Sequence, residues 1–518
     1  MKKSKINTSY LLKPEMVTNS DAQHPTTIKA THQNRSSTMT VQPQYGGVLR
    51  IADTWSFPTN MGVPGRQNVG APSLEPIVEH FFRVDREGKL IPHLIEFWEY
   101  SEDGLHLTLH LRKGIKFHDG TEFDAEAAKW NLIKGREFKG TLKGILSIDA
   151  IDKYTILLNM KNYDNIFLSQ LAVSSGFVHS PTAYKTYGEE YCAVHPVGTG
   201  PFKFVSYKPD VSIISQRFDD YWQKGKPYLD KIEMLYVKDI KTGVDMLRSG
   251  EADVAVNING RSATSLLSEG YIISKLPGIM EALLPDSLNS DSPLTDKRVR
   301  QAMEYAIDRP AIVKALGYGY FALTQLATEA VYGYNPEIEG RPYNPYKAKK
   351  LLKEAGYPDG FKTKLIGGDA TELPAIFAAI KANLADVGIE AEIEIADAAL
   401  WKDYRANRPW HNASLLGHYP IDPNFLFTFL DFHTKREYGQ TSVLRNFDDI
   451  INAALQARDY DTLVKNTQRI VKHLFDEAIV IPITVDPAIA AASTKVHDVG
   501  YFEAHLRIWT PWNAWIEH

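Results

Sequence analysis

Apolar and polar residues alternate strictly along residues 105–111. Leucines stand at the four odd positions with polar residues between them, a period of two that predicts a half-buried β-strand. A second alternating run, residues 148–160, predicts another strand. Between the two runs, Asp124 precedes an alanine-rich segment with helical spacing of its apolar residues, and we expect it to be the N-cap of a helix.

Helical periodicity dominates the second half of the chain. Over residues 299–306, apolar residues recur at i, i+3, i+4 and i+7, which predicts a helix with one buried face and Thr295 as its cap. The stretch NPYKAKKLLKEAGY predicts a further helix with both ends marked. Asn344 is its N-cap, Pro345 takes the first helical position and Gly356 ends it.

Helices and strands also alternate along the sequence. A strand is expected at residues 48–52, and helices at about 375–387 and about 460–475 each lead into a strand-like run, IEAEIEI and AIVIPI. This alternation predicts α/β lobes. Three tryptophans near the C-terminus are interpreted as a core that closes a lobe: Trp509, Trp512 and Trp515.

The stretch HPVGTGPFKFVSY raises the question of a phosphate-binding loop. A Walker loop has four residues between its glycines and then Gly-Lys-Ser/Thr, whereas Gly198 and Gly200 are separated by one residue. Pro201 also removes a backbone amide that such a loop would use. The alternating apolar residues that follow favour a strand over a helix, so we predict a turn that leads into a strand.

Length and charge narrow the class of protein. The 518 residues are too many for one simple core and suggest two or three subdomains. A net charge of −5 gives no reason to expect nucleic acid or an anionic membrane surface as a partner. Cys192 is the only cysteine, so neither an intrachain disulfide nor a cysteine-based metal cluster is possible.

The first 45 residues, 1–45, are expected to form a disordered N-terminal segment. From residue 18 to residue 44 the sequence is rich in Ser, Thr, Asn, Gln and His. Lysines near the start could begin a signal peptide, but no apolar run follows, and no cysteine is placed for lipid attachment. The sequence itself therefore shows no export route.

Catalytic and metal-binding motifs are scarce. The sequence contains no G-x-S-x-G and no H-E-x-x-H. Cys192 and His195 are close in sequence, but thiol–imidazole pairs are made in space, so a small buried residue beside a loop histidine is preferred. For His411, His418 and His433, hydrogen-bonded roles are favoured over metal ligation. Chemistry alone therefore favours binding over catalysis.

Five blocks of sequence carry a family resemblance when they are taken in order. They are the segment around LRKGIKFHDG in residues 90–131, PVGTGPFKFVSY with the later FDDYW, RVRQAMEYAIDR at 298–309, YNPYKAKKLLKEAGY at 343–357, and DEAIVIPI at 476–483. Together they resemble the family 5 extracellular solute-binding proteins, the receptors of peptide- and nickel-type ABC importers. The resemblance covers the chain from about residue 46 to the C-terminus.

That resemblance implies a fold class and a domain organisation. The fold class is α/β, a two-lobed periplasmic-binding-protein-like fold of the cluster C type with an extra subdomain in lobe I. Hinge crossings are expected near residues 276–284 and 481–486. The expected divisions are 1–45 for the N-terminal segment, 46–280 for lobe I with its subdomain, 281–484 for lobe II and 485–518 for the return to lobe I.

The resemblance also implies a function. The chain is expected to capture a small polar solute, oligopeptide-like or metal-chelate/opine-like, between two closing lobes and to deliver it to the permease subunits of an ABC importer. It would act as a monomer in the periplasm or at the cell surface, with no cofactor, no nucleic acid partner and no enzymatic activity. A nickel or metallophore-chelate receptor is the first alternative, and a hydrolase on the same fold is an alternative of another class.

Most of the candidate ligand residues come from two loops of the family. Peptide-binding relatives carry an aspartate that pairs with the peptide α-amino group, but LLGHYPIDPNF has no acid there, and His418 or Tyr419 stands in its place. The loop after the first strand faces the ligand in the family. The candidates are Trp55, Arg66, Asn68, Asn289, Trp410, His418, Tyr419 and Asn424, with His418 and His433 as weak metal candidates where no metal is expected.

Overall fold

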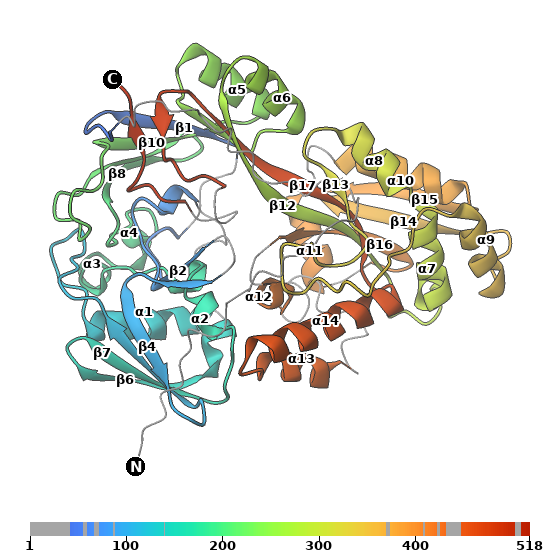
Figure 1. The fold of residues 1–518 in the computed structure, drawn as a ribbon, viewed down its shortest axis with the longest axis horizontal. Coiled ribbons are helices and arrows are strands. Elements are labelled where there is room, and N and C mark those ends of the chain that lie inside the picture. The colour runs from blue at the N-terminus through green and yellow to red at the C-terminus, as the bar shows by residue number, and fades with distance from the viewer. Residues whose placement is uncertain are drawn as a thin grey trace, which may run out of the picture.

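Two long strands, β12 (Ile272–Pro285) and β17 (Ile481–Ala492), connect the two halves of the molecule (Figure 1). They pair antiparallel from Ile272, opposite Ala492, to Leu283, opposite Ile481. We name the half with the N-terminal strands lobe I and the other half lobe II. The structure is a computed structural model that describes residues 42–54, 60–66, 72–85, 89–138, 140–368, 373–407, 410–421, 425–430, 447–502 and 509–518.

One mixed sheet runs through both lobes and the connecting strands. Its other strands are β1 (Val48–Asp53), β8 (Phe202–Lys208), β9 (Ser212–Arg217), β10 (Lys231–Tyr236), β11 (Val254–Val256), β13 (Phe321–Ala322), β14 (Phe361–Gly368), β15 (Ile389–Ala396) and β16 (Ala413–Pro420). The order is β15-β14-β16-β12-β17-β11-β1-β10-β9-β8, with β13 paired to β17. In lobe I, β1 is parallel to β10 and β11, and in lobe II, β14 is parallel to β15 and β16.

Lobe I carries a subdomain with a separate antiparallel sheet. Its strands, in the order β4-β5-β7-β6, are β4 (Ile95–Tyr100), β5 (His106–Leu111), β7 (Thr155–Met160) and β6 (Ile145–Asp152). The strand predicted at 105–111 is confirmed, with Leu107 and Leu109 fully buried. The single strand predicted at 148–160 is wrong: the run divides into β6 and β7, because Asp152 Oδ1 accepts a 2.8 Å hydrogen bond from the amide of Tyr154 and forms a turn.

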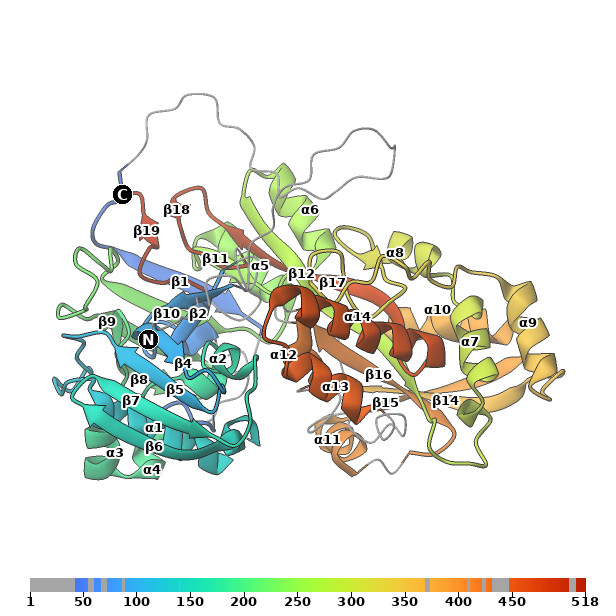
Figure 2. The same cartoon turned by 60° about the horizontal axis from the view of Figure 1, so that its bottom comes forward.

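Helices pack around both sheets (Figures 1 and 2). They are α1 (Ala125–Phe138), α2 (Phe167–Gln170), α3 (Pro181–Tyr187), α4 (Glu189–Cys192), α5 (Ile240–Ser249), α6 (Gly260–Ser268), α7 (Lys297–Ala306), α8 (Arg309–Leu316), α9 (Pro345–Glu354), α10 (Leu373–Ala385), α11 (Ala398–Asn407), α12 (Phe425–Leu430), α13 (Asp448–Leu455) and α14 (Tyr460–Glu477). In the described ranges none of them is both long and apolar enough to cross a membrane.

The helix ends test three of the predicted caps. Asp124 accepts a hydrogen bond from the amide of Ala127, and Asn344 accepts one from the amide of Lys347, so both predicted N-caps are confirmed. Thr295 was the wrong cap for α7. The side chain of Asp296 accepts from the helix amide, whereas the hydroxyl of Thr295 donates back to the carbonyls of residues 289 and 292.

The end of the chain returns to lobe I after β17. There β18 (Val496–His497) pairs with β19 (Trp515–Ile516). Trp509, Trp512 and Trp515 are 1%, 7% and 3% exposed, which confirms that they form core. The N-terminal segment expected at 1–45 falls almost wholly outside the described residues.

Candidate functional site at the junction of the lobes

The connecting strands leave no room for a side chain at Gly278. A Cβ atom on Gly278 would lie 2.8 Å from the carbonyl oxygen of Asp486 and from the amide nitrogen of Ala488. The pairing register shifts between Pro277 and Ile279 at the same place. A side chain at position 278 would push the strands apart, so glycine is needed where they cross between the lobes.

Polar residues of the connecting strands lie a few positions beyond Gly278. In the pairing register, Glu281 of β12 lies opposite Thr484 of β17 and opposite His418 of β16. Glu281 is 4% exposed, and Thr484 is fully buried with its Oγ1 3.3 Å from Oδ1 of Asp486. Buried carboxylates and hydroxyls are costly unless they have polar partners. The two connecting strands thus carry buried polar side chains, Glu281 and Thr484, where the lobes meet.

A buried carboxylate also ends the first strand of lobe I. Asp53 is 3% exposed and accepts a 2.8 Å hydrogen bond from the side-chain amide of Asn257. Asn257 has a φ of 57°, a left-handed conformation that asparagine adopts more readily than most residues. Because β1, β10 and β11 are parallel, their carboxyl ends meet at one edge, where open α/β sheets bind ligands. Asp53 is therefore a candidate that the sequence analysis missed.

A buried hydrogen-bond network centres on Glu79. The carboxylate accepts hydrogen bonds from the Thr199 hydroxyl at 2.9 Å and the Tyr221 hydroxyl at 2.8 Å, and it lies 2.9 Å from His93 Nε2. Burial alone would raise the pKa of Glu79, but His93 and these hydrogen bonds outweigh burial and lower the pKa. All of these partners belong to lobe I, so the network fixes the interior of that lobe.

A second buried carboxylate joins the end of the chain to lobe I. Glu75 Oε2 lies 3.0 Å from Nη1 of Arg83, whose Nη2 donates a 2.7 Å hydrogen bond to the carbonyl of Trp509. Arg83 also lies over the ring of Trp512. Burial, only partly offset by Arg83, raises the pKa of Glu75 to about 7. This cluster explains how the return segment is held against the lobe.

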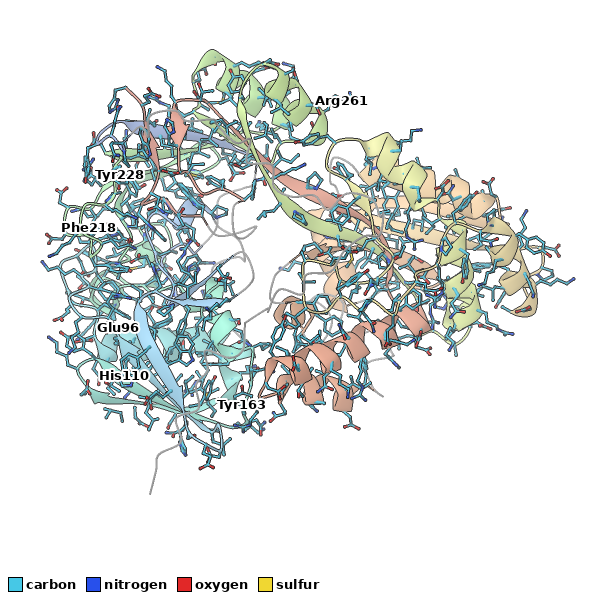
Figure 3. All side chains as sticks on the ribbon, in the orientation of Figure 1. Glu96, His110, Tyr163, Phe218, Tyr228 and Arg261 are labelled. Atoms are coloured by element: carbon cyan, nitrogen blue, oxygen red, sulfur yellow. The ribbon has the colours of Figure 1, made fainter. Side chains whose placement is uncertain are left out.

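The lobes touch a second time, away from the connecting strands. In Figures 1 and 2, α2 of lobe I lies beside α13 of lobe II, and Figure 3 labels Tyr163 at this place. The side-chain amide of Asn165 donates to the carbonyls of Ala454 at 2.7 Å and Ala457 at 3.1 Å. Arg458 donates in the opposite direction, to the carbonyl of Asp103 at 2.6 Å. We name this contact the rim contact.

Three of the predicted ligand residues are held by neighbours in their own lobe. Arg66 forms a 2.6 Å ion pair with Glu189 and lies over the ring of Phe138. The side-chain amide of Asn289 donates to a carboxylate oxygen at the end of β12, and the indole of Trp410, 6% exposed, donates to a backbone carbonyl at the end of α11. Their roles as ligand contacts stay predictions.

The other candidates are placed only in part. Trp55, Asn68, Asn424 and His433 lie outside the described residues. His418 and Tyr419 belong to β16, where they pair with Glu281 and Met280 of β12 in the register. The structure thus brings the backbone of these two candidates to the connecting strands. Among the described residues, no group of three or more His, Cys, Asp or Glu side chains is arranged to hold a metal ion.

The glycine stretch has a structural role. The strand predicted after the turn is confirmed as β8. A Cβ atom on Gly198 would lie 2.2 Å from the carbonyl oxygen of Ile77, and one on Gly200 would lie 2.5 Å from that of Pro76. The two glycines let this turn pass directly against the segment before Glu79, a close approach that no larger residue permits.

The pair Cys192 and His195 lacks the features of a nucleophile and base. Cys192 is 3% exposed, and burial raises the pKa of its thiol, the opposite of an activated thiolate. His195 Nδ1 bonds to the carbonyl of Tyr191, and its ring stacks on the Tyr191 ring at 4.0 Å. This arrangement agrees with a structural loop histidine.

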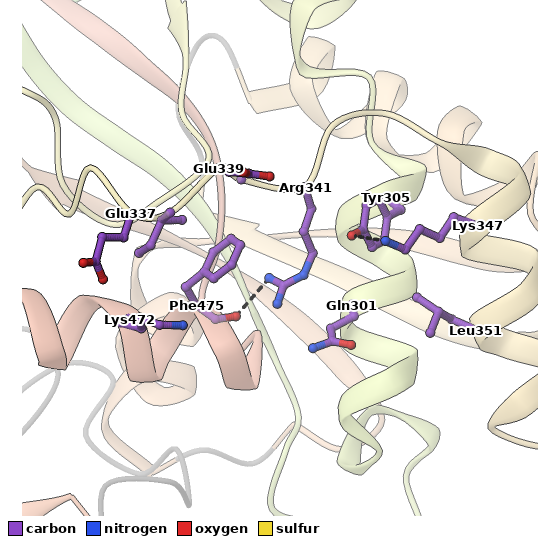
Figure 4. A pocket seen from close by; sticks show the side chains of 11 residues that line it. Gln301, Tyr305, Glu337, Glu339, Arg341, Lys347, Leu351, Lys472 and Phe475 are labelled. Carbon is purple, nitrogen blue, oxygen red and sulfur yellow. Dashed lines mark hydrogen bonds between the residues drawn. The ribbon is translucent and has the colours of Figure 1, made fainter.

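A cavity of about 390 Å³ lies within lobe II, between α7, α9 and α14 (Figure 4). Its three cations already have partners on the protein. Arg341 pairs with Glu304, the amine of Lys347 bonds to the hydroxyl of Tyr305, and Lys472 pairs with a carboxylate one turn along α14. The cavity is formed by lobe II alone, so it is separate from the junction.

A solute-binding protein is the class that this architecture defines: two α/β lobes on a shared sheet, joined by two strands, with an extra subdomain in one lobe. The sequence model of the bacterial extracellular solute-binding proteins, family 5 middle region, matches residues 89–437. The chain therefore belongs to family 5 of the bacterial extracellular solute-binding proteins.

Individual relatives support this assignment. The glutathione-binding protein GsiB of Escherichia coli (strain K12) is 36% identical over 326 residues, which are 61% of this chain and 63% of that protein. The match thus spans less than two thirds of the length of that relative. The periplasmic binding protein DppA from Helicobacter pylori, solved with the peptide STSA, has a TM-score of 0.78 at 24% identity and covers 92% of this chain and 99% of its own.

A metal-chelate relative has the same fold. NikA from Staphylococcus aureus, solved in complex with Ni(L-His)2, has a TM-score of 0.76 at 23% identity, with 91% of this chain and all of that chain covered. These relatives are binding proteins. The predicted fold class and the predicted family are confirmed.

Proposed function

We propose that this chain is the solute-binding receptor of an ABC importer and that its solute is a small peptide of about the size of glutathione. The observation that carries the proposal is the double connection of the lobes. Strands β12 and β17 join them on one side, and the rim contact at Asn165 joins them again. A ligand between the lobes is then enclosed, which favours a short solute over a long chain.

The substrate class is proposed from the relatives and from the charges at the junction. The GsiB protein of Escherichia coli (strain K12), which is 36% identical to this chain over the matched residues, is named as a glutathione-binding protein. Asp53 at the carboxyl end of β1 and Glu281 on a connecting strand are buried carboxylates and suit the amino group of a peptide. They would replace the acid that LLGHYPIDPNF lacks, with His418 and Tyr419 as neighbours.

The relatives also support a cellular location and a set of partners for this chain. The DppA relative is described as periplasmic and associated with an ABC transporter. We place this chain in the periplasm or at the cell surface, where it would act as a monomer and pass its solute to permease subunits. A metal chelate is the second candidate, because NikA was solved in complex with Ni(L-His)2.

Ligand binding tests the proposal directly. Thermal midpoint and tryptophan fluorescence would be recorded with glutathione, di- and tripeptides, Ni(L-His)2, agropinic acid and mannopinic acid. A ligand bound only by the folded protein, at a hundredfold excess over Kd, stabilises it by about 2.7 kcal/mol. A rise in midpoint with glutathione or short peptides is the expected result. A rise with the chelate or an opine alone would reassign the substrate, and no rise with any solute would reject the proposal.

A further inference from the structure

The rim contact supplies a helix cap from the opposite lobe. The last carbonyls of a helix have no partner within the helix and need one from outside. In α13 of lobe II, the carbonyl of Leu455 is of this kind, whereas the carbonyl of Ala454 also accepts a 3.3 Å hydrogen bond from the amide of Ala457, just past the helix end. The side-chain amide of Asn165 lies 2.7 Å from the Ala454 oxygen, and its backbone amide lies 3.1 Å from the Leu455 oxygen. Lobe I thus completes the end of a lobe II helix.

The contact is reciprocal. Just after α13, Arg458 donates hydrogen bonds to the carbonyls of Glu102 at 3.3 Å and Asp103 at 2.6 Å, in the turn between β4 and β5 of lobe I. Its guanidinium also lies over the ring of Tyr163, 4.5 Å from the centroid. Gln456 adds a 2.8 Å hydrogen bond to the carbonyl of Tyr163. Each lobe therefore satisfies backbone carbonyls of the other.

Apolar burial accompanies these hydrogen bonds. Ile166, the residue after Asn165, is 5% exposed and belongs to the hydrophobic cluster of lobe II, together with Ile451 and Ala454 of α13. If the lobes separated here, Ile166 would enter water and the capped carbonyls would exchange protein partners for water. Both changes favour the closed arrangement.

We propose that Asn165 and Arg458 form a latch that holds the lobes closed and thereby sets the affinity for the solute. Separation at this point disrupts the whole contact at once, because all of its groups bridge the two lobes. A ligand that binds only the closed form binds more tightly when the closed form is already populated. The inference rests on the proposed receptor function for its effect on affinity, but the latch itself can be measured without any ligand.

The experiment is small-angle X-ray scattering of the ligand-free protein and of the double variant Asn165→Ala/Arg458→Ala. The matched control is Asn466→Ala, because Asn466 donates a 3.0 Å hydrogen bond to the carbonyl of Ala453, also in α13, from within lobe II. Loss of this control bond weakens α13 without touching the other lobe. A second control, Arg248→Ala, removes an arginine whose ion pair with Glu269 lies within lobe I.

The double variant is expected to shift the ratio of open to closed molecules at least tenfold, about 1.4 kcal/mol, and to show a larger radius of gyration. Both controls should scatter like the unchanged protein. Where a solute from the panel binds, its Kd should rise in the double variant in proportion to the fall in the closed fraction that scattering measures. An unchanged radius, or an equal increase in Asn466→Ala, would overturn the latch. Unchanged scattering with intact ligand binding would refute the latch alone, whereas a changed radius without ligand binding would refute only the receptor assignment.

Discussion

The ring nitrogen Nε2 of His118 lies 2.9 Å from the carbonyl oxygen of Gly200. This bond joins the turn after β5 to the glycine turn before β8. The same ring meets Phe218 edge to face, so an aromatic side chain covers it. Burial lowers the pKa of His118 to about 4. The imidazole is therefore neutral at neutral pH, and its protonation opposes the folded state.

Acid is expected to destabilise the protein through this histidine. The folded pKa, about 4, lies below the ordinary value of 6.5. Between these two pH values His118 is protonated in the unfolded chain and neutral in the folded protein. The contribution of His118 to the free energy of unfolding should fall by about 1.4 kcal/mol for each pH unit between about 6.5 and about 4. Urea denaturation at pH 7.5, 6 and 5 measures the slope, which should be shallower in His118→Gln than in the control His110→Gln. Equal slopes in the two variants would contradict the assignment.

Gly198 is expected to tolerate no side chain. Its Cβ would meet the carbonyl oxygen of Ile77 at 2.2 Å, and backbone cannot give way cheaply. Gly198→Ala should reduce the free energy of unfolding by about 3 kcal/mol, at the upper end of overpacking costs. Gly144→Ala is the matched control, because its Cβ would meet only the tip of Met160 at 4.0 Å. Chemical denaturation compares the two, and similar stabilities would show that the turn adapts.

The buried pair of Arg341 and Glu304 is expected to be critical for lobe II. Glu304 is 1% exposed, so Arg341→Ala leaves a carboxylate without its charge partner in the interior. Loss of one partner of a buried pair costs about 3–5 kcal/mol. Lys241→Ala removes half of an exposed pair on α5 with Asp245, and it should cost much less, because water screens that pair. Equal losses in urea denaturation would argue against a special role for the buried pair.

Asp53 is expected to contribute to solute affinity. Asp53→Asn keeps the size of the side chain and its ability to accept from Asn257, but it removes the charge. Affinity for a peptide that binds through its amino group should fall about tenfold or more, the effect of losing a charge-assisted hydrogen bond. Isothermal titration measures this, with the exposed Asp245→Asn as control. Unchanged affinity in Asp53→Asn would place the amino group elsewhere.

Local patterns in the sequence determined the elements and the family. The leucine alternation produced β5, and Asn344 and Pro345 began α9, because such preferences depend on neighbouring residues. The run at 148–160 and the cap at Thr295 were misread, since a turn made by Asp152 and a competing Asp296 decided them. The five family blocks predicted two lobes, and the family match confirmed the family.

Only the tertiary structure decided how the lobes meet. Asn165 and Ala454 are 289 positions apart, and no motif marks either residue, yet the folded chain joins them through a helix end. In the sequence, Gly198 and Gly200 looked like ordinary turn glycines. The structure shows that glycine is needed there because the backbone of residues 76–77 lies in contact with the turn. Contacts between distant segments depend on how the whole chain packs. A pattern confined to neighbouring residues carries no information about them, and this is why the rim contact emerged only from the fold.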